Sequence, residues 1–172
     1  MNKIITSYTN PDADGICSSI GYSSFLKLSV DKLYEPCYFG SLDSETKYIL
    51  EKCSSIEPID ISSLSLKNIE EIILVDTHHL NQISKEIDPN LVIEILDHHP
   101  SGNPEDFPNA SIDNRVIGSV CTIIAEKFRH SGLMISKELA SLLLFGLISN
   151  TLNLKAPSTT EVDIDLYNWL MP

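Results

Sequence analysis

The chain has 172 residues, enough for one domain with a single buried core, and its 42% hydrophobic and 21% charged residues are typical of a soluble globular protein. Its 12 basic and 24 acidic residues give a net charge of −12, which argues against binding along a nucleic-acid backbone, because such binding needs a basic surface. A short nucleotide substrate is not excluded, because bound divalent cations would reverse the local charge.

Strand-type and helix-type segments alternate along the chain. Strands are expected at residues 3–8, 33–39, 56–60, 71–76 and 91–96, the last two being nearly unbroken apolar runs. Helices are expected at residues 15–28, 43–53, 80–87, 119–130 and 136–149, with a last helix opened by Thr159 or Thr160. Ser41 and Ser136 are expected N-caps, and Gly132 is an expected C-cap. Residues 97–117, rich in proline and glycine, are expected to form a long loop. The alternation predicts one α/β domain over residues 1–172 with a mainly parallel sheet.

The sequence also predicts a protein with reduced thiols and no membrane partner. Its four cysteines form no C-x-x-C pair, so we expect free thiols and a cytoplasmic location. The N-terminus shows no basic segment followed by a long apolar run, so we expect no secretory signal. The longest apolar stretch, near residues 142–148, is too short to span a bilayer.

Carboxylates and imidazoles follow three of the expected strands, at the point where each strand ends. They are Asp12 and Asp14 after the first strand, Asp76, His78 and His79 at the end of 71–76, and Asp97, His98 and His99 after 91–96. In an open parallel sheet, ligands bind outside the carboxyl ends of the strands, so we expect these groups to converge. The alternative is that acids follow strands only because loops are polar.

The pattern of ligand types favours a metal centre. Asp12 and Asp14 lie two residues apart in a turn and can send both carboxylates to one side. If Asp76 bridges two cations, it would hold them about 3.5–4 Å apart. Mixed oxygen and nitrogen ligands, with His98 supplying the nitrogen, favour manganese or a similar transition metal over calcium. The reaction that suits such a centre is metal-catalysed hydrolysis of a phosphoester or phosphoanhydride.

Other roles are open for each of these side chains. Asp12 could only form an Asx-turn, and Asp14 could only cap the helix that begins at Gly15. We expect Asp97 to hold His98 by a hydrogen bond rather than to bind metal itself. We expect His99 to contact substrate phosphate, the alternative being a place in the core. For His78 and His79, a functional role and a merely exposed position are both open.

The ordered motifs resemble the DHH phosphoesterase superfamily and, within it, the family II, manganese-dependent inorganic pyrophosphatases. The first three superfamily motifs are Asn10-Pro11-Asp12-Ala13-Asp14, Leu74-Val75-Asp76 and Asp97-His98-His99. The narrower resemblance rests on residues 40–46, 118–124, 147–152 and 155–160, so the likeness covers nearly the whole chain.

The resemblance implies a doubly wound, mainly parallel sheet with helices on both faces and a centre for one or two ions of Mn²⁺, or of Co²⁺ or Mg²⁺. It implies metal ligation by Asp12, Asp14, Asp76 and His98. It gives His99 and Asp97 catalytic roles, His99 near the substrate phosphate and Asp97 as the orienting acid. Lys155, close to the motifs with Arg115, is expected to contact a small phosphorylated substrate. Two copies are expected to pair through this domain.

The chain departs from the family at two ligand positions. Tyr8 stands where the family has histidine, and Asn150 stands where it has aspartate. A phenol, with a pKa of about 10, is a poor ligand unless deprotonated, and an amide oxygen is a weaker ligand than a carboxylate. One metal position could therefore be empty or hold Mg²⁺, or His78 or His79 could serve as a replacement ligand.

The length of the chain is a further departure. The family's second domain, which clamps the substrate with basic residues, is expected to be absent from residues 1–172. We favour an active phosphohydrolase that cleaves pyrophosphate or a small phosphoester through a metal-bridged hydroxide. The alternative is a degenerate DHH domain that binds a metal or nucleotide, or regulates, with little or no turnover.

Overall fold

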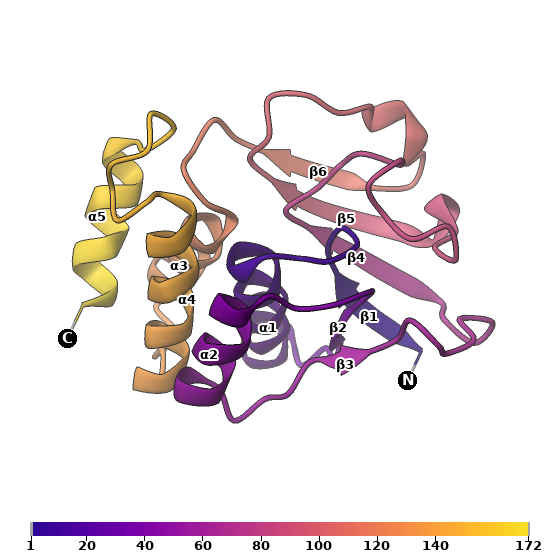
Figure 1. The fold of residues 1–172 in the computed structure, drawn as a ribbon, viewed down its shortest axis with the longest axis horizontal. Helices are drawn as coiled ribbons and strands as arrows, with labels where there is room; N and C mark the ends of the chain where they lie inside the picture. The colour runs from indigo at the N-terminus through magenta and orange to yellow at the C-terminus, as the bar shows by residue number, and fades with distance from the viewer. Residues whose placement is uncertain (1, 172) are drawn as a thin grey trace.

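Within residues 2–171, which the computed structural model describes, six parallel strands form one sheet in the order β3-β2-β1-β4-β5-β6 (Figure 1). The strands are β1 (Lys3–Thr6), β2 (Glu35–Tyr38), β3 (Ile59–Asp60), β4 (Glu71–Val75), β5 (Val92–Asp97) and β6 (Ser111–Asn114). The central pair is β1 and β4, in register from Lys3 opposite Glu71 to Thr6 opposite Leu74. The strand order reverses between these two strands, which is where doubly wound sheets bind ligands. The prediction of an α/β fold with a mainly parallel sheet is confirmed.

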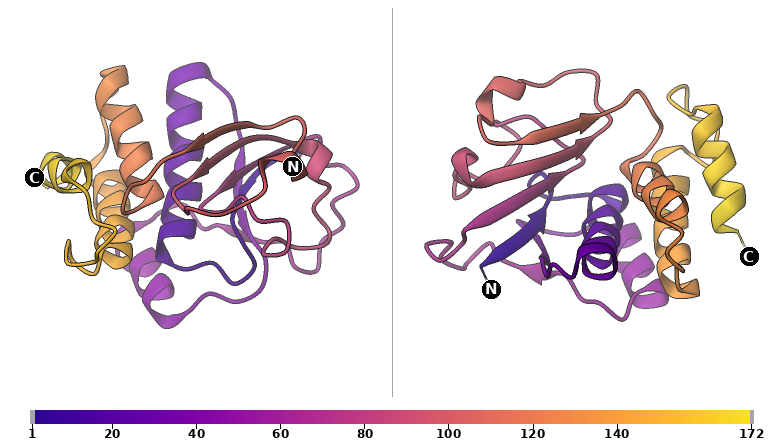
Figure 2. Two further views of the ribbon diagram at one scale, coloured as in Figure 1. Left: turned by 90° about the horizontal axis from the view of Figure 1, so that it is seen from above. Right: turned by 180° about the vertical axis from the view of Figure 1, so that it is seen from behind.

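The α-helices of the described chain gather on one face of the sheet, as both views in Figure 2 show. They are α1 (Ala13–Val30), α2 (Ser44–Cys53), α3 (Val120–Ser131), α4 (Lys137–Asn150) and α5 (Glu161–Leu170). Helix α1 lies against β1, β2 and β4, and α3 contacts β5. Helix α4 packs on α1 and α3, and α5 packs on α3 and α4. The larger hydrophobic core therefore lies between the sheet and this layer of helices.

Polar side chains set where the helices begin. Ser136 caps α4 through the backbone N–H of Leu139, as the sequence predicts. Of the two threonines expected to open the last helix, Thr160 caps α5, and it does so in a reciprocal capping box. Gly132 ends α3 with a left-handed φ of 69°, also as predicted. The prediction for Ser41 is wrong, because Asp43 caps α2 and Ser41 donates its backbone N–H to Asn10.

The second face of the sheet is covered by turns rather than by α-helices, which differs from the expectation of helices on both faces. A smaller core lies here, built from β-strand residues and from side chains such as Ile61, Ile83, Ile87 and Phe107. The covering segments include two short 3₁₀ helices, η1 (Pro89–Leu91) and η2 (Pro104–Asp106). Among the described residues, none of the helices has the length and apolar composition needed to cross a bilayer.

Two sequence predictions are wrong on this side of the molecule. Residues 80–87 form turns, not a helix. Ile83 and Ile87 have helical spacing and are buried, but Thr77 Oγ1 donates to Gln82 Oε1 within a local turn that competes with a helix. The predicted loop 97–117 contains the edge strand β6, which pairs with β5 along Glu94–Asp97. Its sequence, SIDN, has one apolar residue and therefore gives little strand signal.

Candidate metal centre

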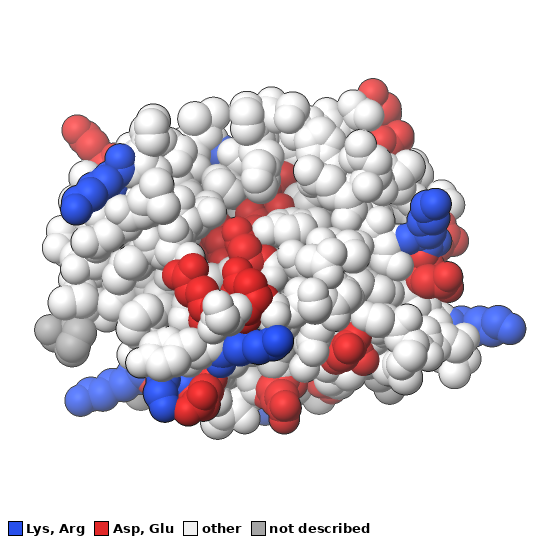
Figure 3. Space-filling view, viewed as in Figure 1, with Lys and Arg blue, Asp and Glu red and all other residues white. Residues whose placement is uncertain are grey.

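The carboxyl ends of β1, β4 and β5 bring three of the expected ligands together. His98 Nε2 lies 3.1 Å from Asp76 Oδ1 and 3.9 Å from Asp14 Oδ2. His99 is next to them, with its Nδ1 4.0 Å from Asp76 Oδ1. Figure 3 shows acidic side chains gathered in a hollow on this face, between the sheet and the helices. The prediction that these strand ends converge is therefore met by the geometry.

Asp76 is buried at the end of β4 in an unusual backbone conformation. Its φ is 62°, and its N–H donates to the carbonyl of Leu96 at 2.8 Å. A non-glycine residue in this region stores strain of the kind found at functional sites. Its Oδ1 makes no hydrogen bond of acceptable geometry within the described residues, although His98 is in contact. Burial and the nearby Asp14 carboxylate raise the pKa of Asp76 to about 8. A desolvated carboxylate oxygen without a donor suits a cation.

Asp14 is held by the N-terminus of another helix. Its carboxylate accepts hydrogen bonds from Ser119 Oγ at 2.7 Å, the Val120 N–H at 2.9 Å and the Cys121 N–H at 3.0 Å. The alternative role as cap of its own helix is wrong, because Asp12 caps α1 by accepting from the Gly15 N–H. Burial raises the pKa of Asp14. The side chain is thus fixed, with Oδ2 toward His98.

His98 is oriented with one ring nitrogen toward the acids. Its Nδ1 lies 2.9 Å from the carbonyl of Ile117. A carbonyl only accepts, so Nδ1 carries the proton and Nε2 faces the carboxylates. This is how metal-binding histidines are usually held. Burial lowers the pKa of His98, but Asp76 and Asp14 outweigh that effect and raise it to about 9.

Asp97 holds His98, as the sequence predicts, and is also hydrogen-bonded to two other histidines. Its Oδ1 accepts from the backbone N–H of His98 at 2.7 Å and from His99 Nδ1 at 2.8 Å. Its Oδ2 is hydrogen-bonded to His78 Nδ1. The expected hydrogen bond between Asp97 and His98 is present, but it is made by the backbone N–H of His98, while the Ile117 carbonyl orients the imidazole. Burial raises the pKa of Asp97, but the bonds with His99 and His78 outweigh it and leave the pKa below its usual value.

His78 and His79 are engaged outside the cluster. His78 is buried between Asp97 and Gly102, so close that a Cβ at Gly102 would overlap its ring. His79 Nε2 lies 3.3 Å from Ser101 Oγ. His78 therefore holds Asp97 in place through a hydrogen bond. The contacts of His78 and His79 do not support either residue as a replacement metal ligand.

Tyr8 and Asn150 lie at the candidate metal centre, but they do not present the imidazole and the carboxylate that the family has at these positions. Tyr8 Oη accepts from the backbone N–H of Asp12 at 3.1 Å, and burial, followed by the charges of Asp12 and Asp76, raises the pKa of its phenol. Asn150 Nδ2 donates to the carbonyl of Gly118 at 2.8 Å and lies 3.3 Å from His98 Nε2. Asn150 therefore presents an N–H, not an oxygen, toward His98.

A pocket of about 120 Å³ opens over these groups. Its lining residues are Tyr8, Asp12, Asp76, Gln82, His99 and Asn150. Gln82 was missed by the sequence analysis, because residues 80–87 were expected to form a helix outside the site. Lys155 is exposed and does not line this pocket, so its substrate contact stays a prediction.

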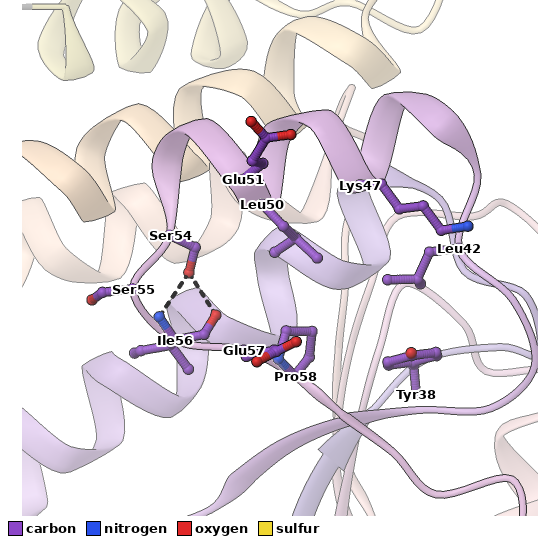
Figure 4. A pocket seen from close by; sticks show the side chains of 10 residues that line it. All are labelled: Tyr38, Leu42, Lys47, Leu50, Glu51, Ser54, Ser55, Ile56, Glu57 and Pro58. Carbon is purple, nitrogen blue, oxygen red and sulfur yellow. Dashed lines mark hydrogen bonds between the residues drawn. The ribbon is translucent and has the colours of Figure 1, made fainter.

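A larger pocket, of about 480 Å³, lies beside α2 and residues 54–58 (Figure 4). None of its described lining side chains is an imidazole, and its two carboxylates are Glu51 and Glu57. The smaller pocket is lined by the buried Asp76 and by Asp12 and His99, and His98 lies beside Asp76, so we place the candidate site there.

Comparison with known proteins shows the family to which this chain belongs. The sequence matches the DHH family, N-terminal domain, over residues 2–147. The chain belongs to the DHH family. This DHH chain is 34% identical over 162 residues to a protein of Brevibacillus brevis named probable manganese-dependent inorganic pyrophosphatase, covering 94% of the chain and 52% of the relative. A relative with the same name in Bacillus licheniformis is 32% identical over 95% of the chain and 53% of its own length.

Solved structures agree on the fold. A crystal structure from Methanococcus jannaschii, described as that of a putative family II inorganic pyrophosphatase, superposes with a TM-score of 0.81 at 30% identity, covering 98% of this chain and 55% of that one. An exopolyphosphatase-related protein from Bacteroides fragilis has the same fold, with a TM-score of 0.79 at 20% identity, over 99% of this chain and 52% of its own. The DHH chain thus spans about half the length of the relatives it matches.

The donor set of this DHH chain fits a divalent cation. Asp76, His98 and His99 each offer an atom within 4.8 Å of the others, and Asp14 Oδ2 lies 3.9 Å from the same Nε2 of His98. The orphaned Asp76 Oδ1 and the Nε2 of His98 are the atoms best placed to hold an ion. Tyr8 and Asn150 add neither an imidazole nor a carboxylate, so the fit is better for one ion than for two.

Proposed function

We propose that this DHH chain is the metal-binding part of a phosphohydrolase that cleaves pyrophosphate or a small phosphoester. The observation that carries the proposal is the buried Asp76 Oδ1, which lacks a hydrogen bond within the described residues and lies 3.1 Å from His98 Nε2. Two buried carboxylates and an imidazole at one point are costly without a cation. The names of the pyrophosphatase relatives support the choice of substrate class.

Asp76, His98 and Asp14 would hold one ion, and Asp12 with Asp76 would contribute to a second. Carboxylate and imidazole ligands suit Mn²⁺, with Co²⁺ or Mg²⁺ as alternatives. When bound, such ions activate water as a nucleophile and stabilise charge on phosphoryl oxygens. The protein contributes fixed ligand geometry, since Ile117 orients His98 and the start of α3 orients Asp14.

His99 is the side chain of this chain best placed to meet the substrate. Asp97 occupies its Nδ1, and the side chain is 42% exposed in the pocket. The bond to Asp97 raises the pKa of His99 and so favours the protonated ring. In that form Nε2 would donate a hydrogen bond to a phosphate oxygen, while Asp97 keeps the ring oriented. Gln82, which also lines the pocket, would add a polar contact, and the exposed Lys155 remains an expected contact.

A second function is favoured by Asn150 and Tyr8. The amide N–H directed at His98 occupies the place where the family has a carboxylate. The phenol of Tyr8 stays protonated, because its pKa is raised. These two groups would weaken one ion position and favour a module that binds a metal or a nucleotide with little turnover. The predictions of a cytoplasmic location and a homodimer accompany both functions.

The test compares metal binding with hydrolysis in the same chain. Binding of Mn²⁺, Co²⁺ and Mg²⁺ is measured by calorimetry, and phosphate release is measured from pyrophosphate and from an aryl phosphate. We expect Mn²⁺ binding and phosphate release, both lost in Asp76→Asn and both kept in Asp165→Asn, which changes an exposed aspartate on α5. Binding without phosphate release, with release gained in Tyr8→His/Asn150→Asp, would establish the binding module instead. A chain that binds none of the ions would end both proposals.

A further inference from the structure

Five consecutive residues, 117–121, hold three side chains of the candidate metal centre. The carbonyl of Ile117 accepts from His98 Nδ1 at 2.9 Å, and the carbonyl of Gly118 accepts from Asn150 Nδ2 at 2.8 Å. The next three residues bind Asp14 through one hydroxyl and two backbone N–H groups. A shift of this segment would therefore move His98, Asn150 and Asp14 together.

The 117–121 segment is in turn held by a buried acid on the last helix. Asp163 in α5 is fully buried, and its Oδ2 accepts from the backbone N–H of Gly118 at 2.9 Å. Its Oδ1 accepts from Thr122 Oγ1 at 2.6 Å, one residue beyond the segment. Its remaining bonds, from the N–H and the hydroxyl of Thr160 at 2.7 Å each, belong to the cap of α5. Asp163 thus joins the start of α5 to the start of α3.

The contact between Asp163 and the segment is close enough to exclude a side chain. A Cβ at Gly118 would lie 2.8 Å from Asp163 Oδ2 and 2.7 Å from Thr151 Cγ2. Capping α5 requires only the reciprocal bonds between Thr160 and Asp163. The bonds to Gly118 and Thr122 are additional, and they join α5 to the 117–121 segment and to the start of α3.

We propose that Asp163 is a positioning residue of the metal centre, which fixes His98, Asn150 and Asp14 through the backbone of Gly118. The inference rests on the proposed function, in that these side chains are taken to form a metal site. Asp163 itself lies outside the pocket and would touch neither the ion nor the substrate. Loss of its carboxylate would free the Gly118 N–H and loosen the segment that carries the other contacts.

The test has two readouts on the full chain. The first is the Mn²⁺ affinity measured by calorimetry, and the second is the NMR signals of His98 Hδ1 and the Asn150 side-chain amide in metal-free protein. Asp163→Ala should weaken Mn²⁺ binding by about tenfold or more and should shift both signals. Asp163→Asn should stay close to wild type, because its amide oxygen can still accept from Gly118 while its NH₂ faces the rotatable Thr122 hydroxyl.

Asp165→Ala is the matched control, because Asp165 lies on the same helix with an exposed side chain that pairs with Arg129. It should leave affinity and both signals unchanged. Thr160→Val should lower the melting temperature through the lost cap of α5, yet leave the two signals in place. This pair separates a loosened helix from a displaced metal centre.

A folded Asp163→Ala chain with wild-type affinity and unshifted signals would overturn the inference. If that variant does not fold, Gly118→Ala tests the same contact from the other side, and unchanged signals there would overturn it equally. The NMR readout needs neither metal nor turnover. A wild-type chain that binds no Mn²⁺ or hydrolyses nothing would therefore count against the proposed function, while shifted signals in Asp163→Ala would still support the positioning role.

Discussion

The metal-free protein should lose stability as the pH rises from about 6.5 to about 8. In the folded chain, burial and the Asp14 carboxylate raise the pKa of Asp76 to about 8. Burial lowers the pKa of His98, but Asp76 and Asp14 raise it overall to about 9. In the unfolded chain these groups return to about 4 and about 6.5. Within this window the folded chain binds more protons than the unfolded chain, so its free energy of unfolding must fall as protons become scarce.

The size of the effect follows from the pairing of the two groups. One proton of difference changes the free energy of unfolding by about 1.4 kcal/mol per pH unit. Asp76 and His98 lie 3.1 Å apart, so they titrate as a pair, and we count one proton for both. Across the window of about 1.5 pH units, the expected loss is on the order of 2 kcal/mol.

Urea unfolding followed by circular dichroism, with EDTA present, measures this loss at several pH values. Asp76→Asn removes the buried carboxylate and, with it, the main partner that raises the pKa of His98, so its stability should change much less over the same range. Mn²⁺ replaces the bound proton and should stabilise the wild-type chain more at the upper end of the range. Equal pH dependence in the wild-type chain and in Asp76→Asn would refute the reasoning.

Three further substitutions test other parts of the structure. Asn150→Asp adds a further carboxylate to the centre, so it should lower the melting temperature of the metal-free chain and tighten Mn²⁺ binding by about tenfold, with calorimetry as the check. Gly102→Ala places a methyl group against the His78 ring and should cost about 1–3 kcal/mol in urea unfolding; no measurable cost would mean that this contact is loose. Phe107→Ala should cost about 3–5 kcal/mol, because the ring is 2% exposed in the second core, and a cost under about 1 kcal/mol would show that the covering turns do not pack.

The strands and the site they carry could be predicted because burial leaves a clear mark on the sequence. The segments around β4 and β5 are apolar runs, and Asp76 and Asp97 interrupt them at the strand ends. Adjacent parallel strands bring such ends to one edge of the sheet, which is a property of the topology rather than of any single residue. The caps at Ser136 and Thr160 were equally accessible, because capping depends on a few neighbouring residues.

The hydrogen-bond partners of the polar side chains could not be predicted, because they come from loops that are distant in the sequence and pack against the site only in the folded chain. Several imidazoles lie near Asp97 in the sequence. One of its partners is His78, whose ring packs against Gly102 in a distant loop. Asp163 has the spacing of an ordinary capping box with Thr160, so its contact with Gly118 leaves no trace in the local sequence. The 80–87 segment was misassigned for a related reason, since Ile83 and Ile87 satisfy helical spacing but are buried by turns.

The turns that cover the second face of the sheet set how easily the candidate site loses its geometry on heating or in denaturant. They support His78, which braces Asp97, which in turn orients His99. Segments without helix or sheet bonding open locally at a lower free-energy cost than the layers of a packed core. Warming or mild denaturant should therefore release the His99 imidazole while the sheet and its helices stay intact, so that the proposed hydrolysis would be lost before the chain melts.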